Sequence, residues 1–531
     1  MNMDTVRRVF CLLVPTACLG GVVPTVQAQT IPWTGSWSVA PQTGNFSTTI
    51  SQQTLRQTVR TSIGGTAARI RISNLFGTEP LTVSDVHIAK ANSTTSSAVA
   101  GTDHALTFSG QASVTVAPHA EVDSDPVSMT IESVADYAVS IYFPVPTAVT
   151  NDTIHQNGNQ SSYIAAGDVT AQPSISPVAQ YGSNFFLTNL DVQNAAATGA
   201  VVSLGASITD GINSSFNTNT RWTNDLARRL VAAGLNVGVL NQGISGNQLL
   251  SDGAGLSAGN RFEHDVLSQA NVRYVIFSDD PINDLTSHNP PPSATDLIAG
   301  IQKLQSQAHA KGLKFYCSTL TPYAGYAGWS AQQEPIREQV NTFIRSSSSG
   351  CDGIIDQDTA EHDPADPTFF RPAFNQINGS GDGLHPNDAG MQAIADAVNL
   401  GLFTASGVAP LQQPNGQQGI ALAGQGLRPG QSLLSQDGRF SLSLQTDGSV
   451  FVRQGSTVLW STDATGVPPS ELIFQADGNL VEYDTSGKIL WQSNSAGLLG
   501  HLLILQNDGN LVIYDGSSPN EPIWASNTCC H

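Results

Sequence analysis

The sequence predicts a multidomain chain in which an α/β region lies between two all-β regions. Strand-like alternation of apolar and polar residues runs through the N-terminal third, and short apolar runs alternate with helical periodicity in the middle. An internal repeat fills the C-terminal part. At 531 residues the chain is also too long for one hydrophobic core, so we expect about three domains.

The composition favours a soluble, exported protein. Charged residues make up only 12% of the chain, and acidic residues outnumber basic ones by 42 to 22, which gives a formal charge of −20. Nucleic-acid phosphates must be met by Lys and Arg, so we expect no nucleic-acid partner.

The first 28 residues have the form of a signal peptide. Arg7 and Arg8 precede an apolar stretch from Val9 to Val26, and the segment ends in small residues at Ala28. A membrane anchor and a lipoprotein attached through Cys18 stay open as alternatives. We expect cleavage near Ala28, a secreted chain (extracellular or periplasmic) and no membrane span.

Residues 30–192 are predicted to form an N-terminal β-sandwich. Ala68–Ser73 and Ala138–Phe143 show the alternation of half-buried strands. We interpret three isolated histidines in this region as structural or loop residues: His104, His119 and His155. The domain could pack against its neighbour or shape a substrate cleft.

Residues 198–405 are predicted to form a flavodoxin-like α/β/α domain with a parallel sheet. The expected strands are Ala200–Leu204, Val237–Leu240, Val272–Phe277, Leu313–Cys317 and Gly353–Ile355. The expected helix faces include Trp222, Leu226 and Leu230, and Leu297, Ile301 and Leu304. Such sheets bind ligands at the carboxyl ends of their strands, so we look for a site there.

The mature chain would keep four cysteines: Cys317, Cys351, Cys529 and Cys530. Because export permits disulfides, and because Cys317 follows one predicted strand and Cys351 precedes the next, we expect these two to pair. The partners of the last two stay open. The sequence contains no His/Cys cluster with zinc-ligand spacing, and we expect no metal and no cofactor.

A serine and a distant histidine form the candidate catalytic pair. Ser207 lies in Gly205–Gly211, directly after the first predicted strand, and a serine at such a turn needs a base to become nucleophilic. Gly381–Pro386 supplies one: Asp382 precedes His385 by three residues and can turn back to orient the imidazole.

These blocks resemble those of the SGNH (GDSL-type) hydrolases, in family order. The resemblance implies a carboxylic ester hydrolase with Ser207 as nucleophile, His385 as general base and Asp382 as its orienter. It also implies an oxyanion hole made by the backbone N–H groups of Ser207 and Gly246 and by the Asn283 amide.

Two positions depart from the family pattern. Ala206 stands where the family has Asp before the serine, and Pro281 stands where it usually has Gly. Proline offers no N–H and fixes φ, so the loop that carries Asn283 could lie differently. We expect these changes to lower activity rather than abolish it, and a degenerate enzyme stays open as an alternative.

The N-terminal domain resembles the leading domain of a secreted SGNH subgroup of xylan-esterase-like proteins. The segments that carry this likeness are Trp33–Trp37, Leu55–Arg60 and Arg71–Gly77. The resemblance implies acyl groups on plant polysaccharide as substrate.

A Gln-, Gly- and Pro-rich linker is expected over residues 406–422, followed by a second all-β domain over 423–528. Its repeat recurs every 30 or 31 residues with an Asp-Gly hairpin signal, and each copy is followed by a tryptophan: Trp460, Trp491 and Trp524.

This repeat resembles the β-prism of bulb-type mannose-binding lectins, whose motif is Gln-x-Asp-x-Asn-x-Val-x-Tyr. Two copies match in full: Gln475, Asp477, Asn479, Val481 and Tyr483, and Gln506, Asp508, Asn510, Val512 and Tyr514. The first copy keeps Gln445 and Asp447 but has Ser449, Phe451 and Arg453 at the other positions. We therefore expect two mannose-type glycan sites and one structural repeat, although the motif can also serve hairpin folding alone.

Together these features predict a secreted esterase that removes acetyl or other short acyl groups, with an acylated polysaccharide as substrate and the lectin domain as its anchor. The alternatives are a lipolytic esterase, because one fold serves both substrates, and a catalytically degenerate glycan-binding protein.

Overall fold

The protein is described by a computed structural model. It describes residues 31–92, 96–375, 381–404, 419–422, 424–462, 466–475, 478–484, 488–496, 500–515 and 521–529. The predicted signal peptide, and most of the predicted linker, lie outside these residues. No helix in the described ranges is long and apolar enough to cross a membrane.

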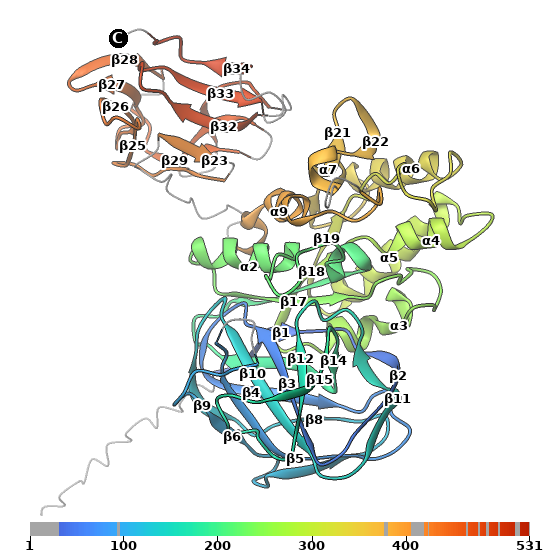
Figure 1. The fold of residues 1–531 in the computed structure, drawn as a ribbon. Helices are drawn as coiled ribbons and strands as arrows, with labels where there is room; N and C mark the ends of the chain where they lie inside the picture. Colours follow the sequence, from blue (N-terminus) through green and yellow to red (C-terminus); the bar gives the residue numbers. More distant parts are fainter. Residues whose placement is uncertain are drawn as a thin grey trace, which may run out of the picture. The chain divides into compact units, whose positions relative to one another are not determined.

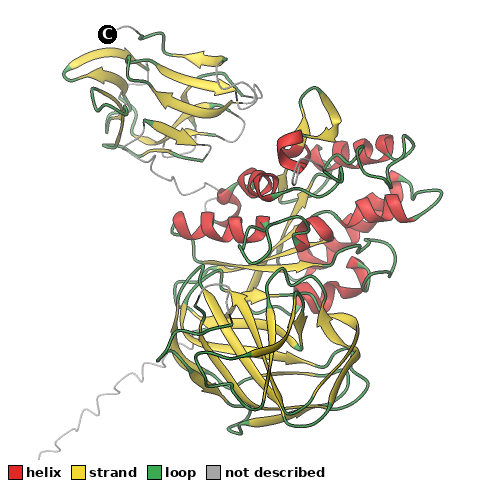
Figure 2. Ribbon diagram, viewed as in Figure 1, coloured by secondary structure: helices red, strands yellow, loops and turns green. Residues whose placement is uncertain are grey.

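The N-terminal region is all-β, as predicted (Figures 1 and 2). Its strands are β1 (Trp33–Ser38), β2 (Gln42–Ile50), β3 (Gln53–Arg60), β4 (Gly65–Ser73), β5 (Leu81–Lys90), β6 (His104–Leu106), β7 (Ser113–Val116), β8 (Glu121–Asp123), β9 (Val127–Ile131), β10 (Asp136–Phe143), β11 (Thr147–His155), β12 (Ser162–Ala166), β13 (Pro177–Tyr181), β14 (Asn184–Phe185) and β15 (Leu187–Gln193). Two antiparallel sheets, one around β15 and β4 and one around β3, β10 and β5, enclose a single apolar core, with a smaller sheet of β14, β11 and β2 beside them.

The middle region is an α/β domain built on a parallel sheet, which confirms the predicted fold class. Its sheet strands are β16 (Gly199–Gly205), β17 (Val237–Gly243), β18 (Val272–Phe277), β19 (Lys314–Ser318) and β20 (Gly353–Ile355), in the order β17-β16-β18-β19-β20. They coincide with the predicted strands, with ends that differ by up to three residues. The order reverses at β16, so the carboxyl end of β16 is where a ligand site is expected.

Helices cover both faces of this sheet (Figure 2). They are α1 (Ser207–Asp210), α2 (Trp222–Ala232), α3 (Ala258–Phe262), the π-helix η1 (Glu263–Leu267), α4 (Asp280–Ser287), α5 (Ala294–Ala310), α6 (Glu334–Arg345), α7 (Gln357–Glu361), α8 (Pro372–Asn375), α9 (Asp388–Ala397) and the 3-10 helix η2 (Leu400–Phe403), with a small hairpin of β21 (His362–Asp363) and β22 (Asp366–Phe370). The apolar faces predicted for α2 and α5 are buried in the core.

The edge strand β17 is covered by the N-terminal region. Val239 N donates to Ser62 Oγ at 2.8 Å, and Gln242 Nε2 donates to Ser38 Oγ, also at 2.8 Å. An unpaired sheet edge is prone to pair with other chains, so these contacts protect it.

The C-terminal region is all-β, as predicted, and consists of three four-stranded sheets. They are formed by β25 (Ser432–Leu434), β26 (Phe440–Leu444), β27 (Val450–Gln454) and β28 (Thr457–Ser461); by β24 (Gly426–Leu427), β29 (Pro469–Phe474), β30 (Leu480–Asp484) and β31 (Ile489–Gln492); and by β23 (Ile420–Leu422), β32 (Gly500–Leu505), β33 (Leu511–Asp515) and β34 (Pro522–Ala525). The three repeat tryptophans meet edge to face, with ring centroids 5.3 to 5.8 Å apart. Each repeat therefore contributes one indole to a shared contact.

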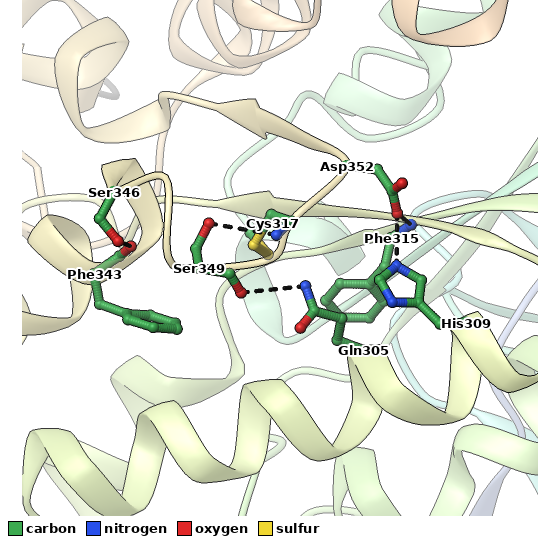
Figure 3. Close-up of a disulfide and its surroundings, with 9 residues drawn as sticks. Gln305, His309, Phe315, Cys317, Phe343, Ser346, Ser349 and Asp352 are labelled. Carbon is green, nitrogen blue, oxygen red and sulfur yellow. Dashed lines mark hydrogen bonds and ion pairs between the residues drawn. A yellow bond between two sulfur atoms is a disulfide. The ribbon is translucent and has the colours of Figure 1, made fainter.

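Cys317 and Cys351 form a disulfide, which confirms the predicted pairing (Figure 3). It links the buried strand β19 to the segment that precedes β20. Next to Cys351, Asp352 accepts a hydrogen bond from Phe315 N at 2.9 Å, so the two strands are joined at neighbouring positions. Cys529 is exposed and carries no disulfide within the described residues, and Cys530 lies outside them.

We expect Cys317→Ala/Cys351→Ala to lower the free energy of unfolding of the α/β domain. The bond spans 34 residues, and releasing a loop of that length costs about 4 kcal/mol on the chain-entropy model. Urea unfolding followed by helical circular dichroism measures it, because the helices of the described residues all lie in this domain. Reduced wild type should match the variant, and equal midpoints for oxidised wild type and variant would contradict the prediction.

Candidate active site

A hydrogen-bonded relay joins Ser207, His385 and Asp382. Ser207 Oγ lies 2.8 Å from His385 Nε2, and His385 Nδ1 lies 2.6 Å from Asp382 Oδ2. Ser207 is the first residue of α1, which follows the fully buried strand β16 almost directly. The arrangement lets the imidazole take a proton from the hydroxyl while the carboxylate holds its other nitrogen.

A tight turn brings the Asp382 carboxylate back to His385. Gly383 has φ 76°, and a Cβ there would lie 2.1 Å from the backbone carbonyl carbon of Gly325. Asp382 Oδ1 accepts the N–H groups of Leu384 and His385, both at 2.9 Å. Burial opposes the charge, but the His385 side chain and these N–H groups outweigh it and hold the pKa of Asp382 well below its usual range.

Two asparagines that the sequence analysis did not single out hold the same turn. Asn375 Nδ2 donates to the His385 carbonyl oxygen at 2.7 Å, and Asn213 Nδ2 donates to it at 3.2 Å. Neither residue lies in a motif block, so only the folded geometry identifies them.

The residues proposed for the oxyanion hole are the first residue of α1, Gly246 in the loop after β17, and Asn283 in α4. Within the described residues, neither the Ser207 N–H nor the Gly246 N–H donates a hydrogen bond to the protein. Asn283 Nδ2 donates to the Asn247 carbonyl oxygen at 2.9 Å, next to Gly246. Two unused backbone donors and a neighbouring amide are the groups that a developing oxyanion needs.

Pro281 fits the structure at its position. It lies in the first turn of α4, the helix that also carries Asn283. The N–H groups of a first turn have no intrahelical acceptor, so a residue without one costs nothing there.

A buried hydrogen bond joins α1 to the N-terminal region. His155 Nε2 lies 3.1 Å from Asp210 Oδ1, and His155 Nδ1 lies 2.9 Å from the Ala40 carbonyl oxygen. Asp210 Oδ2 accepts from Ser245 Oγ at 2.7 Å, next to Gly246. Burial would raise the pKa of Asp210, but His155 and Arg221 more than offset it, so this pKa is lowered. His155 is therefore a structural histidine, as expected, but its partner could not be identified from sequence spacing because it lies 55 residues away.

In the C-terminal region, Gln and Tyr of the two complete motifs pair across a hairpin. Gln475 Nε2 donates to Tyr483 Oη at 2.8 Å, and Gln506 Nε2 donates to Tyr514 Oη at 2.7 Å. In the first repeat, Arg453 instead lies over the Phe451 ring, 4.1 Å from its centroid.

The other motif residues are largely used by the hairpins themselves. Asn479 is 4% exposed and its Nδ2 donates to Gln492 Oε1 at 2.9 Å, while Asn510 Oδ1 accepts from Thr528 N at 3.1 Å. Asp508 Oδ1 accepts from Asn510 N at 3.0 Å. Two further motif residues, Val481 and Val512, are buried. Asp477 lies outside the described residues. The half-buried Gln–Tyr pairs and the exposed Asp508 are thus motif groups that a ligand can reach.

Among the residues that the structure describes, no group of three or more His, Cys, Asp or Glu side chains is arranged to hold a metal ion.

Comparison with known proteins gives two distinct relationships. Residues 203–393 match the GDSL-like lipase/acylhydrolase family. A B-type lectin, plumieribetin from Scorpaena plumieri, is 44% identical over 62 residues, which are 12% of this chain and 54% of that protein. The chain thus spans about half the length of this curated relative.

Two solved structures are similar to parts of the chain. Mannose-binding lectins from Gastrodia elata are 35% identical and cover 21% of this chain and 99% of theirs, with a TM-score of 0.20. A GDSL-like lipase from Bacteroides thetaiotaomicron is 16% identical and covers 38% of this chain and 87% of its own, with a TM-score of 0.28.

Asp280, beside the candidate oxyanion loop, is a buried carboxyl group. Its Oδ1 accepts from Asn247 Nδ2 at 2.8 Å and lies 3.6 Å from Arg261 Nη2, whereas its Oδ2 has no hydrogen-bond partner in the described residues. Burial is the largest influence, and the pKa of Asp280 is raised to about 6.

We expect Asp280→Asn to flatten the pH dependence of stability. The folded pKa of about 6 exceeds the ordinary value, so the wild type loses stability as pH rises from about 4 to about 6 and stays less stable above that. The amide does not titrate. The unfolding free energy of the variant relative to wild type should therefore rise, by on the order of 3 kcal/mol, between pH 4 and pH 7. Urea unfolding at both pH values measures it, and a constant difference between the two proteins would argue against the raised pKa.

Proposed function

We propose that this chain, which carries a GDSL-like lipase/acylhydrolase domain and a C-terminal domain related to bulb-type mannose-binding lectins, is a secreted serine esterase acting on an acylated polysaccharide. The observation that carries the proposal is the relay of Ser207, His385 and Asp382 at the carboxyl end of β16. The acyl groups removed are acetyl or similarly short.

The geometry supports a two-step mechanism. Ser207 Oγ attacks the ester carbonyl carbon while His385 Nε2 takes the hydroxyl proton, and the N–H groups of Ser207 and Gly246 stabilise the oxyanion. The ester C–O bond then breaks, His385 returns its proton to the leaving alcohol, and the acyl group stays on Ser207. Water adds to this acyl-enzyme with His385 again as base, and the carboxylic acid leaves as Ser207 regains its proton.

A cavity with several amide side chains in its wall supports a sugar as the alcohol part of the substrate. It measures about 270 Å³ and lies between α1 and the N-terminal region, with Asn213 in its wall. Asn157 and Asn159 also line it, and Phe216 is 49% exposed at its edge. Amides that can pair with hydroxyl groups, beside an exposed aromatic ring, suit a carbohydrate better than an alkyl chain.

A lipolytic esterase is the second candidate. A larger cavity of about 620 Å³ is lined by Leu250, Pro290 and Pro292 and also by Asp284, which lies next to Asn283. These apolar side chains could receive an acyl chain longer than acetyl, and activity that rises with chain length would favour this candidate.

Secretion is part of the proposal. It rests on the signal-like N-terminal segment and on the Cys317–Cys351 disulfide, because disulfides persist in oxidising compartments.

We expect Ser207→Ala to lose at least about 10³-fold in the hydrolysis of 4-nitrophenyl acetate and in acetate release from acetylated xylan, because no other group can carry the acyl intermediate. Ser203→Ala is the matched control: Ser203 lies four residues earlier on the buried strand β16, and its hydroxyl has no hydrogen-bond partner in the described residues. The control should keep wild-type activity. Wild type as inactive as Ser207→Ala on both substrates would favour the degenerate glycan-binding alternative.

We expect Tyr483→Phe/Tyr514→Phe to weaken binding to immobilised mannan while leaving the fold intact. Each change removes one hydroxyl from a Gln–Tyr pair and keeps the ring, so each site should lose roughly fivefold in affinity, the equivalent of one hydrogen bond. Gln445→Ala in the first repeat is the control and should bind like wild type. Unchanged retention of the double variant would contradict the site assignment.

A further inference from the structure

The turn that presents Ser207 lacks a cap of its own. Ala206 occupies the position before α1, and its methyl side chain accepts no hydrogen bond. The family pattern has an aspartate at this position, so the backbone N–H groups that open α1 must find their acceptors elsewhere.

Asp279 supplies those acceptors from the turn between the neighbouring strand β18 and α4. Its Oδ1 accepts from Ala206 N at 3.0 Å and from Thr209 N at 3.3 Å, and its Oδ2 accepts from Ile208 N at 2.8 Å. The Thr209 hydroxyl also donates to Oδ1, at 2.7 Å. The side chain is buried, so these four donors take the place of water around the carboxylate.

The parallel register of the sheet explains how Asp279 reaches the turn. Leu204 on β16 lies beside Phe277 on β18, and Ala206 and Asp279 each follow two residues later. The two positions are therefore level with each other across adjacent strands. Gly205 leaves the necessary space, because a Cβ there would lie 2.5 Å from Asp279 Oδ1.

The carboxylate binds the turn selectively. It takes the N–H groups of Ala206, Ile208 and Thr209 and leaves that of Ser207 without a protein acceptor in the described residues. Holding the peptide groups on both sides of Ser207 fixes the direction of its own N–H, which is the donor assigned to the oxyanion. A rigid donor costs no reorganisation when the charge develops.

We propose that Asp279 is a positioning residue for the nucleophile. From the turn after β18, it replaces the carboxylate that the family carries next to the serine. The inference rests on the proposed esterase function. On this proposal, the carboxylate that is missing at Ala206 is present at Asp279 instead.

The transfer can be reversed by mutation. Asp279→Leu should lower kcat for 4-nitrophenyl acetate by about 10²-fold to 10³-fold, with KM changed by less than about threefold, because the lost contact acts on the transition state. Ala206→Asp alone should also lower kcat, because it places two carboxylates in one buried cage. The double variant Ala206→Asp/Asp279→Leu should recover to within about tenfold of wild type.

Recovery by the double variant separates positioning from a general packing role, since packing losses at two neighbouring sites would not cancel. Asp279→Leu with wild-type kcat, or a double variant no better than either single variant, would overturn the proposal while leaving the esterase function intact. Should Asp279→Leu not fold, Asp279→Asn keeps the shape of the side chain with one acceptor fewer. It should lower kcat less than Asp279→Leu, and adding Ala206→Asp to it should cause no further loss of kcat.

An inactive wild type would instead defeat the proposed function, and hydrogen exchange then decides the role of Asp279. Amide exchange of the peptide covering residues 203–211 should speed up at least tenfold in Asp279→Leu and return toward wild type in the double variant. Equal exchange in all three proteins would contradict the proposal.

Discussion

Ser207 and His385 are 178 residues apart in the chain, and the hydrogen bond between them depends on the parallel sheet. Strands β17, β16 and β18 are adjacent and point the same way, so the loops that follow them emerge at one edge. The segments that follow these strands carry Gly246 in a loop, Ser207 at the start of α1 and Asn283 in α4. The sheet thereby sets the relative heights of the nucleophile and the candidate oxyanion donors, and the turn at Gly383 brings in the base.

Behind the nucleophile, buried carboxylates act as internal acceptors. Asp279 holds the turn of Ser207, Asp210 holds Ser245, and Asp284 accepts the N–H groups of Leu249 and Leu250 at 2.6 and 2.9 Å. Each of them accepts hydrogen bonds from backbone N–H groups that would otherwise be buried without an acceptor. Within the described residues, the N–H groups of Ser207 and Gly246 have no protein acceptor.

The local parts of this design could be predicted from sequence, and the long-range parts could not. The strands of the α/β sheet are continuous apolar runs, and Asp382 and His385 lie within one turn, so periodicity and spacing were sufficient. His155 and Asp279 gave no such signal, because each acts on a residue that is distant in sequence and next to it only in the fold. From the sequence alone, Ala206 therefore indicates only the loss of a carboxylate beside the serine. In the lectin repeats the motif was evident, but not that Asn479 is buried and committed to Gln492.

The contact of Trp460, Trp491 and Trp524 has a consequence for how the C-terminal domain can diverge. Each indole is stabilised by the other two, so the folding of each repeat depends on the tryptophans of the other two repeats. The hydrogen bonds described above for the polar motif, by contrast, each stay within one repeat. A repeat can thus lose its sugar-binding residues and still contribute its tryptophan to the fold. The first repeat, in which Arg453 stacks on Phe451, is an example. In such a domain the number of binding sites can change one at a time, whereas the number of repeats cannot.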